Sequence, residues 1–374
     1  MTRQELEEAI AGNDAAPLMR GQRSLSEVRT RLEAWLASRL PSLGKLTISQ
    51  LDVPSSGGVA NETLLLETMC NGRPGPGLVV RPEGEQWLYP EITLDLHREM
   101  YEGVRAAGTV PVPAILALES DTSLLGSRFL LMERVSGQAA PDRPNFNRAG
   151  WLHDLPTRAR ETVWRNSISA MAALHAIDTY RFPLLESTAA GKTGVQAGLD
   201  YWTRYANWCH RADHPLITAA IAWLGKHLPI QSSSLSWGDA RLQNLMFVGT
   251  HCTAVLDWDL VSLAGAESDL AWWALADHKH TASRGRTRLD GIGSPADTIQ
   301  LWESISGRKA LAMEWHLIFA AFRQALISFR LEQISATRQQ SYSREPSIGL
   351  QWLACLLGLP LGQPMTLPFV GLER

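Results

Sequence analysis

The residues best suited to do chemistry lie in one stretch of the second half of the chain. Asp239 follows a glycine, Asn244 comes five residues later, and Asp257 ends a short apolar run. A carboxylate can orient an attacking hydroxyl group, and amide and carboxylate oxygens suit Mg²⁺. Arg241, two residues after Asp239, could reach over a transferring phosphate. This set predicts phosphoryl transfer, with Asp239 and Arg241 as catalytic residues and Asn244 and Asp257 as ligands of Mg²⁺.

Each of these residues also has a plainer interpretation. Asp239 could cap its own turn, Asp257 could be a carboxylate at a strand end, and Arg241 could be a surface guanidinium. Their occurrence together favours the catalytic interpretation for Asp239 and Asp257. Asp259 could face the same side of an extended segment as Asp257, which makes it an alternate metal ligand or a residue that supports one.

The run G-D-A-R-L-Q-N at 238–244, followed by L-D-W-D at 256–259, resembles the catalytic and metal motifs of the aminoglycoside phosphotransferase (choline-kinase-like) family. Further matches occur in the same order over roughly residues 45–335, among them V-V-R at 79–81, H-R-E at 97–99 and G-A-E-S-D-L-A-W at 265–272. The subgroup that looks closest contains the kinase domains found beside acyl-CoA dehydrogenases.

This resemblance implies an α+β, bilobal, protein-kinase-like fold. The N-lobe would hold an antiparallel sheet with one main helix, and the larger C-lobe would be mostly helical. The family implies ATP and Mg²⁺ as cofactors and a small-molecule hydroxyl as acceptor. The residues that would bind the nucleotide lie in a glycine loop, on the third strand, on the N-lobe helix and in the hinge between the lobes: Ser56, Gly57, Gly58, Asn61, Arg81, Glu99, Met132, Glu133 and Val135.

The chain departs from the family pattern at two positions. No lysine lies between Lys45 and Lys192, so Arg81 takes the phosphate-binding position on the third strand, with Glu99 as its predicted partner. Arginine supplies a permanent charge and a planar fork that binds phosphate through two hydrogen bonds. The histidine usual before Gly-Asp is replaced by Trp237. These departures keep one alternative open, a nucleotide-binding pseudokinase that regulates without phosphotransfer.

The change of hydrophobic periodicity along the chain predicts three parts. Residues 1–44 form an N-terminal helical extension, 45–136 form the sheet-rich N-lobe, and 137–374 form the helical C-lobe. The family resemblance implies the hinge at the end of the N-lobe and the acceptor site in the C-lobe. Within the N-lobe, residues 94–107 predict one helix that Gly108 ends.

Composition narrows the class of protein. The chain has 374 residues, 45% of them hydrophobic, and a net charge of −3, which disfavours a disordered chain or a general nucleic-acid binder. Four scattered cysteines suit reduced thiols. No apolar run approaches the roughly 18 residues of a membrane span, and no signal peptide is evident. We therefore expect a cytoplasmic protein without nucleic-acid or membrane partners.

The charge of the C-lobe bears on the acceptor. Residues 137–374 carry 22 Lys and Arg against 20 Asp and Glu, whereas a polycationic aminoglycoside needs a carboxylate-rich pocket. The balance favours a neutral or anionic hydroxylated metabolite. In the same lobe, His175 predicts a structural helix histidine, and His278 and His280, on either side of Lys279, predict an exposed helix end.

Overall fold

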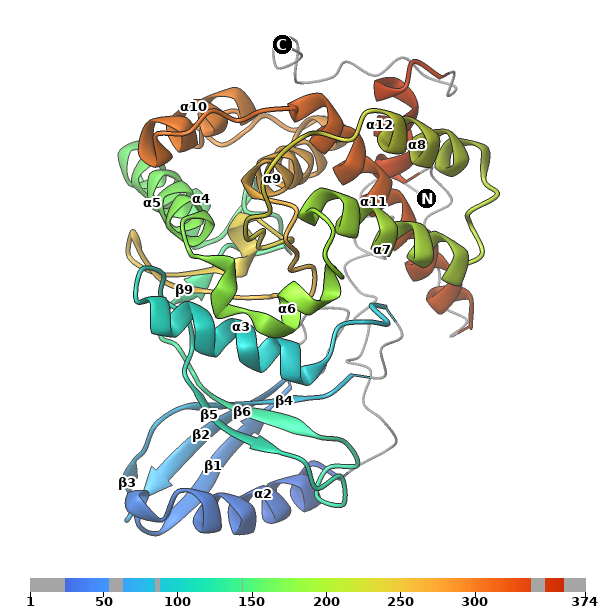
Figure 1. The fold of residues 1–374 in the computed structure, drawn as a ribbon. Helices are drawn as coiled ribbons and strands as arrows, with labels where there is room; N and C mark the ends of the chain where they lie inside the picture. The colour runs from blue at the N-terminus through green and yellow to red at the C-terminus, as the bar shows by residue number, and fades with distance from the viewer. Residues whose placement is uncertain (1–23, 54–62, 85–87, 143, 338–346, 360–374) are drawn as a thin grey trace, which may run out of the picture.

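The computed structural model describes residues 24–53, 63–84, 88–142, 144–337 and 347–359. It consists of a sheet-rich N-lobe and a larger helical C-lobe (Figure 1). The predicted α+β, bilobal, kinase-like class is confirmed. Among the described residues, no helix is both long enough and apolar enough to cross a membrane.

The N-lobe is built on an antiparallel sheet with strand order β1-β2-β4-β6-β5, and β3 pairs with β2. The strands are β1 (Leu46–Asp52), β2 (Leu64–Cys70), β3 (Arg73–Pro74), β4 (Leu78–Pro82), β5 (Ile115–Glu119) and β6 (Phe129–Glu133). Alternation of buried and partly exposed residues along β4 fits a sheet packed on one face more tightly than on the other.

Two helices flank this sheet (Figure 1). Helix α2 (Leu25–Arg39) is followed by the short turn η1 (Pro41–Leu43) and buries Leu32 and Leu36 in a hydrophobic core shared with the sheet. Helix α2 therefore packs as part of the N-lobe. Helix α3 (Leu94–Ala107) lies between the sheet and the C-lobe, starts at the Thr93 cap and ends at Gly108, which matches the predicted bounds.

The C-lobe surrounds a small sheet of β7 (Gln138–Ala139), β8 (Leu245–Val248) and β9 (His251–Val255), in the order β7-β8-β9. Its helices are α4 (Trp151–Asp154), α5 (Thr157–His175), α6 (Pro183–Thr188), α7 (Gly194–Trp208), α8 (Pro215–Lys226), α9 (Ala266–His280), α10 (Pro295–Ser306), α11 (Met313–Thr337) and α12 (Ile348–Leu356), with short turns η2 (Thr179–Arg181), η3 (Leu242–Asn244) and η4 (Ala282–Arg284). Helices α9 and α11 are almost wholly buried along much of their lengths, so the centre of this lobe is held by helix packing.

Candidate active site

The position of Asp239, in the loop before β8, depends on the preceding residue, Gly238, which no other residue could replace. Gly238 has a φ of +92°, and a Cβ built on it would lie 1.9 Å from the carbonyl oxygen of Leu260. The chain therefore approaches the 256–260 segment more closely than a side chain permits. The η3 turn that follows carries Asn244 back toward Asp239.

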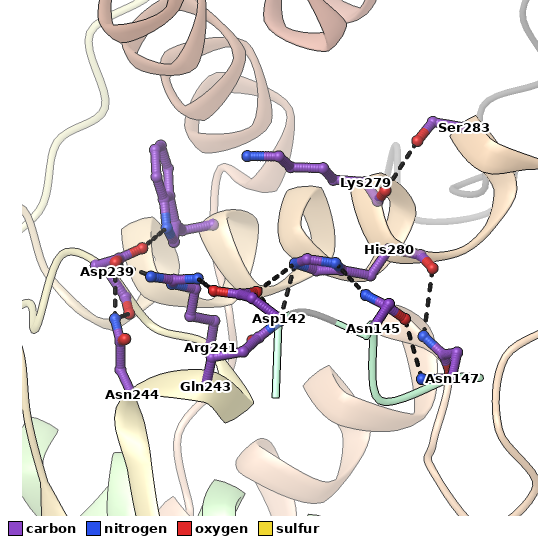
Figure 2. Close-up of polar contacts among 11 residues, drawn as sticks. Asp142, Asn145, Asn147, Asp239, Arg241, Gln243, Asn244, Lys279, His280 and Ser283 are labelled. Carbon is purple, nitrogen blue, oxygen red and sulfur yellow. Dashed lines mark hydrogen bonds and ion pairs between the residues drawn. The ribbon is translucent and has the colours of Figure 1, made fainter. Parts of the chain in front are cut away.

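Three donors fix the carboxylate of Asp239 (Figure 2). Trp272 Nε1 donates to Oδ1 at 2.7 Å, while Asn244 Nδ2 and Arg241 Nε donate to Oδ2 at 2.7 and 3.0 Å. Burial disfavours ionisation of Asp239, but the charge of Arg241 and the bonds from Trp272 and Asn244 outweigh it and keep the pKa of this carboxyl below its ordinary value. Asp239 is therefore an oriented, ionised carboxylate.

A second carboxylate, Asp269 on α9, holds the backbone of the same loop. Its Oδ1 accepts hydrogen bonds from Ser236 Oγ at 2.9 Å and from the Gly238 N–H at 2.7 Å, and its Oδ2 accepts from the Trp237 N–H at 2.6 Å. Asp269 is fully buried. Each bond is charge-assisted and shielded from water, so the loop conformation is set before any substrate arrives.

His175 completes this support from α5. Trp302 Nε1 donates to His175 Nδ1 at 3.0 Å, so the proton of a neutral ring lies on Nε2, which is 2.8 Å from Asp269 Oδ2. The ring is buried between two helices. The expectation of a structural helix histidine agrees with this position.

Trp237 connects its own loop to the segment that carries Asp257 through hydrogen bonds of its indole. Its indole N–H donates to the carbonyl oxygens of Leu256 and Asp257, at 2.8 and 3.1 Å, and the Leu256 N–H donates to the Asn244 carbonyl at 2.9 Å. The loop that carries Asp239 and the segment that carries Asp257 are thus tied together without a histidine. Asp257 has a φ of +62°, which these bonds help to hold.

The carboxylate of Asp257 differs from that of Asp239. In the described part of the chain it accepts no hydrogen bond from a side chain or the backbone, and burial together with the charges of Asp259 and Asp239 raises its pKa to about 7. A divalent cation would relieve this repulsion. Carboxylate and amide oxygens are hard ligands, so Asp257 and Asn244 fit Mg²⁺, which binds few protein groups and keeps phosphates and water as its other ligands.

Arg81 and Glu99 do not form the predicted pair. Arg81 on β4 instead pairs with Asp259, and His97 Nε2 on α3 lies 2.8 Å from the same Asp259 oxygen. Burial opposes ionisation of Asp259, yet Arg81 and His97 lower its pKa to about 2. Both oxygens of Glu99 accept backbone N–H groups at the start of α6, at 2.7 and 3.0 Å, because its turn of α3 faces that helix rather than β4.

The remaining predicted nucleotide residues occupy two places. Met132 is buried near the end of β6, Glu133 ends that strand and is exposed, and Val135 follows it, half-buried. Ser56, Gly57, Gly58 and Asn61 lie outside the described residues.

The expected exposed helix end around Lys279 is wrong. His278 and His280 are both buried, and His280 Nε2 lies 2.9 Å from Gln243 Nε2 (Figure 2). Arg241 NH1 and Gln243 Nε2 both donate to Asp142, at 3.1 and 3.0 Å. A polar network therefore extends from Asp239 along the C-terminal part of α9.

Sequence reasoning assigned no role to Asp142, Gln243, Asp269 or Trp272. Asp269 and Trp272 stand within the matched stretch 265–272, three residues apart and so on adjoining positions of one helix face, and this spacing is the signal that could have found them. Asp142 is separated by 99 residues from Arg241, and no local pattern reveals such a pair.

The family follows from comparison with known proteins. A family model described as "Phosphotransferase enzyme family" (APH) matches residues 54–305. The chain belongs to this family. In the C-lobe, the match includes the Asp239 loop, the Asp257 segment and α9 with Asp269 and Trp272.

Relatives of known sequence share part of their length with this family member. Acyl-CoA dehydrogenase family member 11 of Homo sapiens is 28% identical over 257 residues, which are 65% of this chain and 30% of that protein. Acyl-CoA dehydrogenase family member 10 of Mus musculus is 30% identical over 210 residues, 53% of this chain and 18% of that protein. The chain thus spans less than a third of these relatives.

Solved structures share the fold. A putative aminoglycoside phosphotransferase from Ralstonia eutropha superposes with a TM-score of 0.61 at 23% identity, covering 87% of this chain and 98% of that one. A thermostable mutant of aminoglycoside phosphotransferase APH(4)-Ia, in a ternary complex with ADP and hygromycin B, gives a TM-score of 0.54 at 14% identity, with 89% and 99% covered.

Proposed function

We propose that this phosphotransferase transfers the γ-phosphate of ATP, bound with Mg²⁺, to a hydroxyl group of a small molecule in the cytoplasm. The observation that carries the proposal is the fixed carboxylate of Asp239, held by Trp272, Asn244 and Arg241 beside the unsatisfied carboxylate of Asp257. Phosphoryl transfer depends on positioning and charge more than on covalent chemistry, and this arrangement supplies both.

Asp239 acts on the acceptor. Its ionised carboxylate accepts a hydrogen bond from the acceptor hydroxyl, orients that oxygen and takes its proton as the new bond to phosphorus forms. Because Trp272 and Asn244 each occupy a different oxygen, the carboxylate cannot rotate and keeps its remaining lone pairs in a fixed direction.

Other residues act on the nucleotide. Asp257 and Asn244 would hold Mg²⁺, which when bound neutralises charge on the phosphates. Arg81 and Arg241 hold phosphate oxygens from the N-lobe and the C-lobe. The glycine loop and the hinge at Met132, Glu133 and Val135 are proposed to bind the rest of ATP, because the family resemblance gives them that role.

The decisive variant is Asp239→Asn, which keeps the shape of the side chain and removes the base. We expect transfer to a panel of alcohols to fall by about 10²–10⁴-fold while affinity for ATP with Mg²⁺ changes little. Asp154→Asn is the matched control, since Asp154 is an exposed aspartate of the same lobe. Transfer that survives Asp239→Asn contradicts the assigned role. A wild-type protein that binds ATP and neither transfers nor slowly releases phosphate would instead be the pseudokinase that Trp237 and the missing lysine suggested.

A further inference from the structure

Lys279 differs from the other lysines of the chain. Lys45, Lys192, Lys226 and Lys309 are all exposed, and two of them pair with acidic side chains. Lys279, on the last turn of α9, is only partly accessible. Within the described residues its ammonium makes no hydrogen bond and no ion pair, although its backbone carbonyl accepts from Ser283. A partly accessible cation without a protein partner is available to an anionic ligand.

This ammonium lies on the side of α9 that serves Asp239. Lys279 follows Trp272 by seven residues, which is two helical turns and places both on one face. Trp272 is the donor to Asp239 Oδ1, and Figure 2 shows the Lys279 side chain extending from α9 toward the Asp239 end of the network. The acceptor hydroxyl of the proposed reaction belongs in this region.

Charges of both signs surround Lys279. Burial lowers the pKa of its ammonium, and the charges of Arg241 and Arg284 lower it further, against the opposing charges of Asp239 and Asp142. Both carboxylates already have partners, because Asp239 accepts from Arg241 and Asp142 accepts from Arg241 and Gln243. Neither of these two carboxylates is therefore left without a partner that could be exchanged for Lys279 at no cost.

We propose that Lys279 binds an anionic group, a carboxylate or a phosphate, carried by the same acceptor molecule whose hydroxyl faces Asp239. This inference rests on the proposed function and narrows its substrate class to hydroxylated anions. The anion completes the ammonium's ion pair and sets the acceptor's orientation along α9. A polycationic aminoglycoside would instead bring like charges against Lys279 and Arg241.

Matched acceptors that differ by one charge test the proposal. The dissociation constants of glycerate, glycerol 3-phosphate and glycerol are measured by titration calorimetry on the protein loaded with ADP and excess Mg²⁺, with hygromycin B as the cationic comparison. Phosphate transfer from ATP to each compound is measured separately. The two anions distinguish a carboxylate site from a phosphate site.

We expect the wild-type protein to bind at least one anion more tightly than glycerol by about tenfold to a hundredfold, the range of one charge-assisted contact. Lys279→Met should abolish this preference and leave the affinity for ADP unchanged, while Lys279→Arg should retain part of it. Lys226→Met, which removes an exposed lysine of α8, should behave as wild type.

Binding decides this inference and phosphate transfer decides the proposed function, so the two can fail separately. Equal affinity for glycerol and both anions, or a preference that survives Lys279→Met, overturns the role of Lys279. A loss of the same factor for charged and neutral compounds also overturns it, since a structural residue would act on both. Anion binding without any phosphate transfer by the wild-type protein overturns the proposed function, and with it the designation of the anion as acceptor.

Discussion

Two neighbouring segments of the C-lobe carry the candidate chemistry and are supported in opposite ways. In the loop 236–244, both the backbone and the Asp239 carboxylate are hydrogen-bonded by buried groups. In the segment 256–259, the backbone is held by the Trp237 indole, but the Asp257 carboxylate is left among like charges. The first segment is complete as it stands, whereas the second leaves a carboxylate charge that the proposed Mg²⁺ would offset.

The difference in support fits the different roles proposed for the carboxylates of Asp239 and Asp257. A residue that orients a hydroxyl gains from being rigid in advance, because the ordering cost is met during folding. A metal ligand gains from a charge that the protein leaves uncompensated, because that charge contributes to metal affinity. Substitutions in the two segments should therefore change stability in opposite directions.

Asp269→Ala should produce the largest effect. It leaves the buried N–H groups of Trp237 and Gly238 and the His175 ring without their acceptor. We expect the free energy of unfolding to fall by about 3–5 kcal/mol, the range for breaking a buried charged network. Chemical denaturation measures it, with Asp154→Ala as control because that carboxylate is exposed. A loss below about 1 kcal/mol would show that the loop is held by packing alone.

Asp257→Asn should act in the opposite direction in the metal-free protein. Removing a buried charge that faces Asp259 and Asp239 should raise the free energy of unfolding by about 1–2 kcal/mol. The stabilisation that ADP and Mg²⁺ give the wild-type protein should be largely lost. Denaturation with and without Mg²⁺ measures both effects, and Asp290→Asn, at an exposed position, is the control. Destabilisation of the metal-free variant would remove the contrast between the segments.

Trp237→Phe tests the connection between the two segments. It should cost about 1–2 kcal/mol and lower turnover, because two carbonyl oxygens lose their indole donor. Trp258→Phe is a closely matched control, since Trp258 is equally buried but its indole nitrogen has no hydrogen-bond partner in the described structure. Equal losses for the two variants would mean that ring volume, and not the hydrogen bonds, joins the segments.

Glu99→Gln should have the smallest effect, since Glu99 belongs to neither segment. A glutamine still offers one oxygen to the start of α6, so we expect about 0.5 kcal/mol of destabilisation and an unchanged affinity for ATP. Arg81→Ala should weaken ATP binding about tenfold or more, as loss of a phosphate contact requires. If Glu99→Gln weakened ATP binding as strongly as Arg81→Ala, the two residues would be coupled after all.

Local signals in the sequence predict much of the fold. Helix α3 was predicted with its bounds because the apolar spacing and the terminal glycine agree, and the structure adds a cap at Thr93. Helix α10 was not predicted, although Ser294, Pro295 and Asp297 form a capping box with proline at its first turn. Its signal lies in the cap residues, which a search for apolar periodicity overlooks.

In the candidate site, too, contacts between residues close in sequence were predictable and contacts between distant residues were not. Asp239, Asn244 and Arg241 come together as their short spacing predicts, since a turn between a glycine and a strand brings them into contact. The predicted pairing of Arg81 with Glu99 was wrong because a salt bridge depends on the orientation of the two side chains and not on their spacing in the sequence. Arg81 and Asp259 are 178 residues apart, and only the packing of the lobes shows that the nearer Glu99 faces elsewhere.

Asp259 has a further consequence for how the lobes move. It belongs to the C-lobe segment that carries Asp257, yet it pairs with Arg81 of β4 and lies 2.8 Å from His97 Nε2 of α3, so one C-lobe carboxylate meets two side chains of the N-lobe. Separating the lobes at this point would leave the buried charges of Asp259 and Arg81 without each other as partners. This carboxylate therefore joins the two lobes next to Asp257, and a rotation that separates the lobes there has to break the ion pair with Arg81.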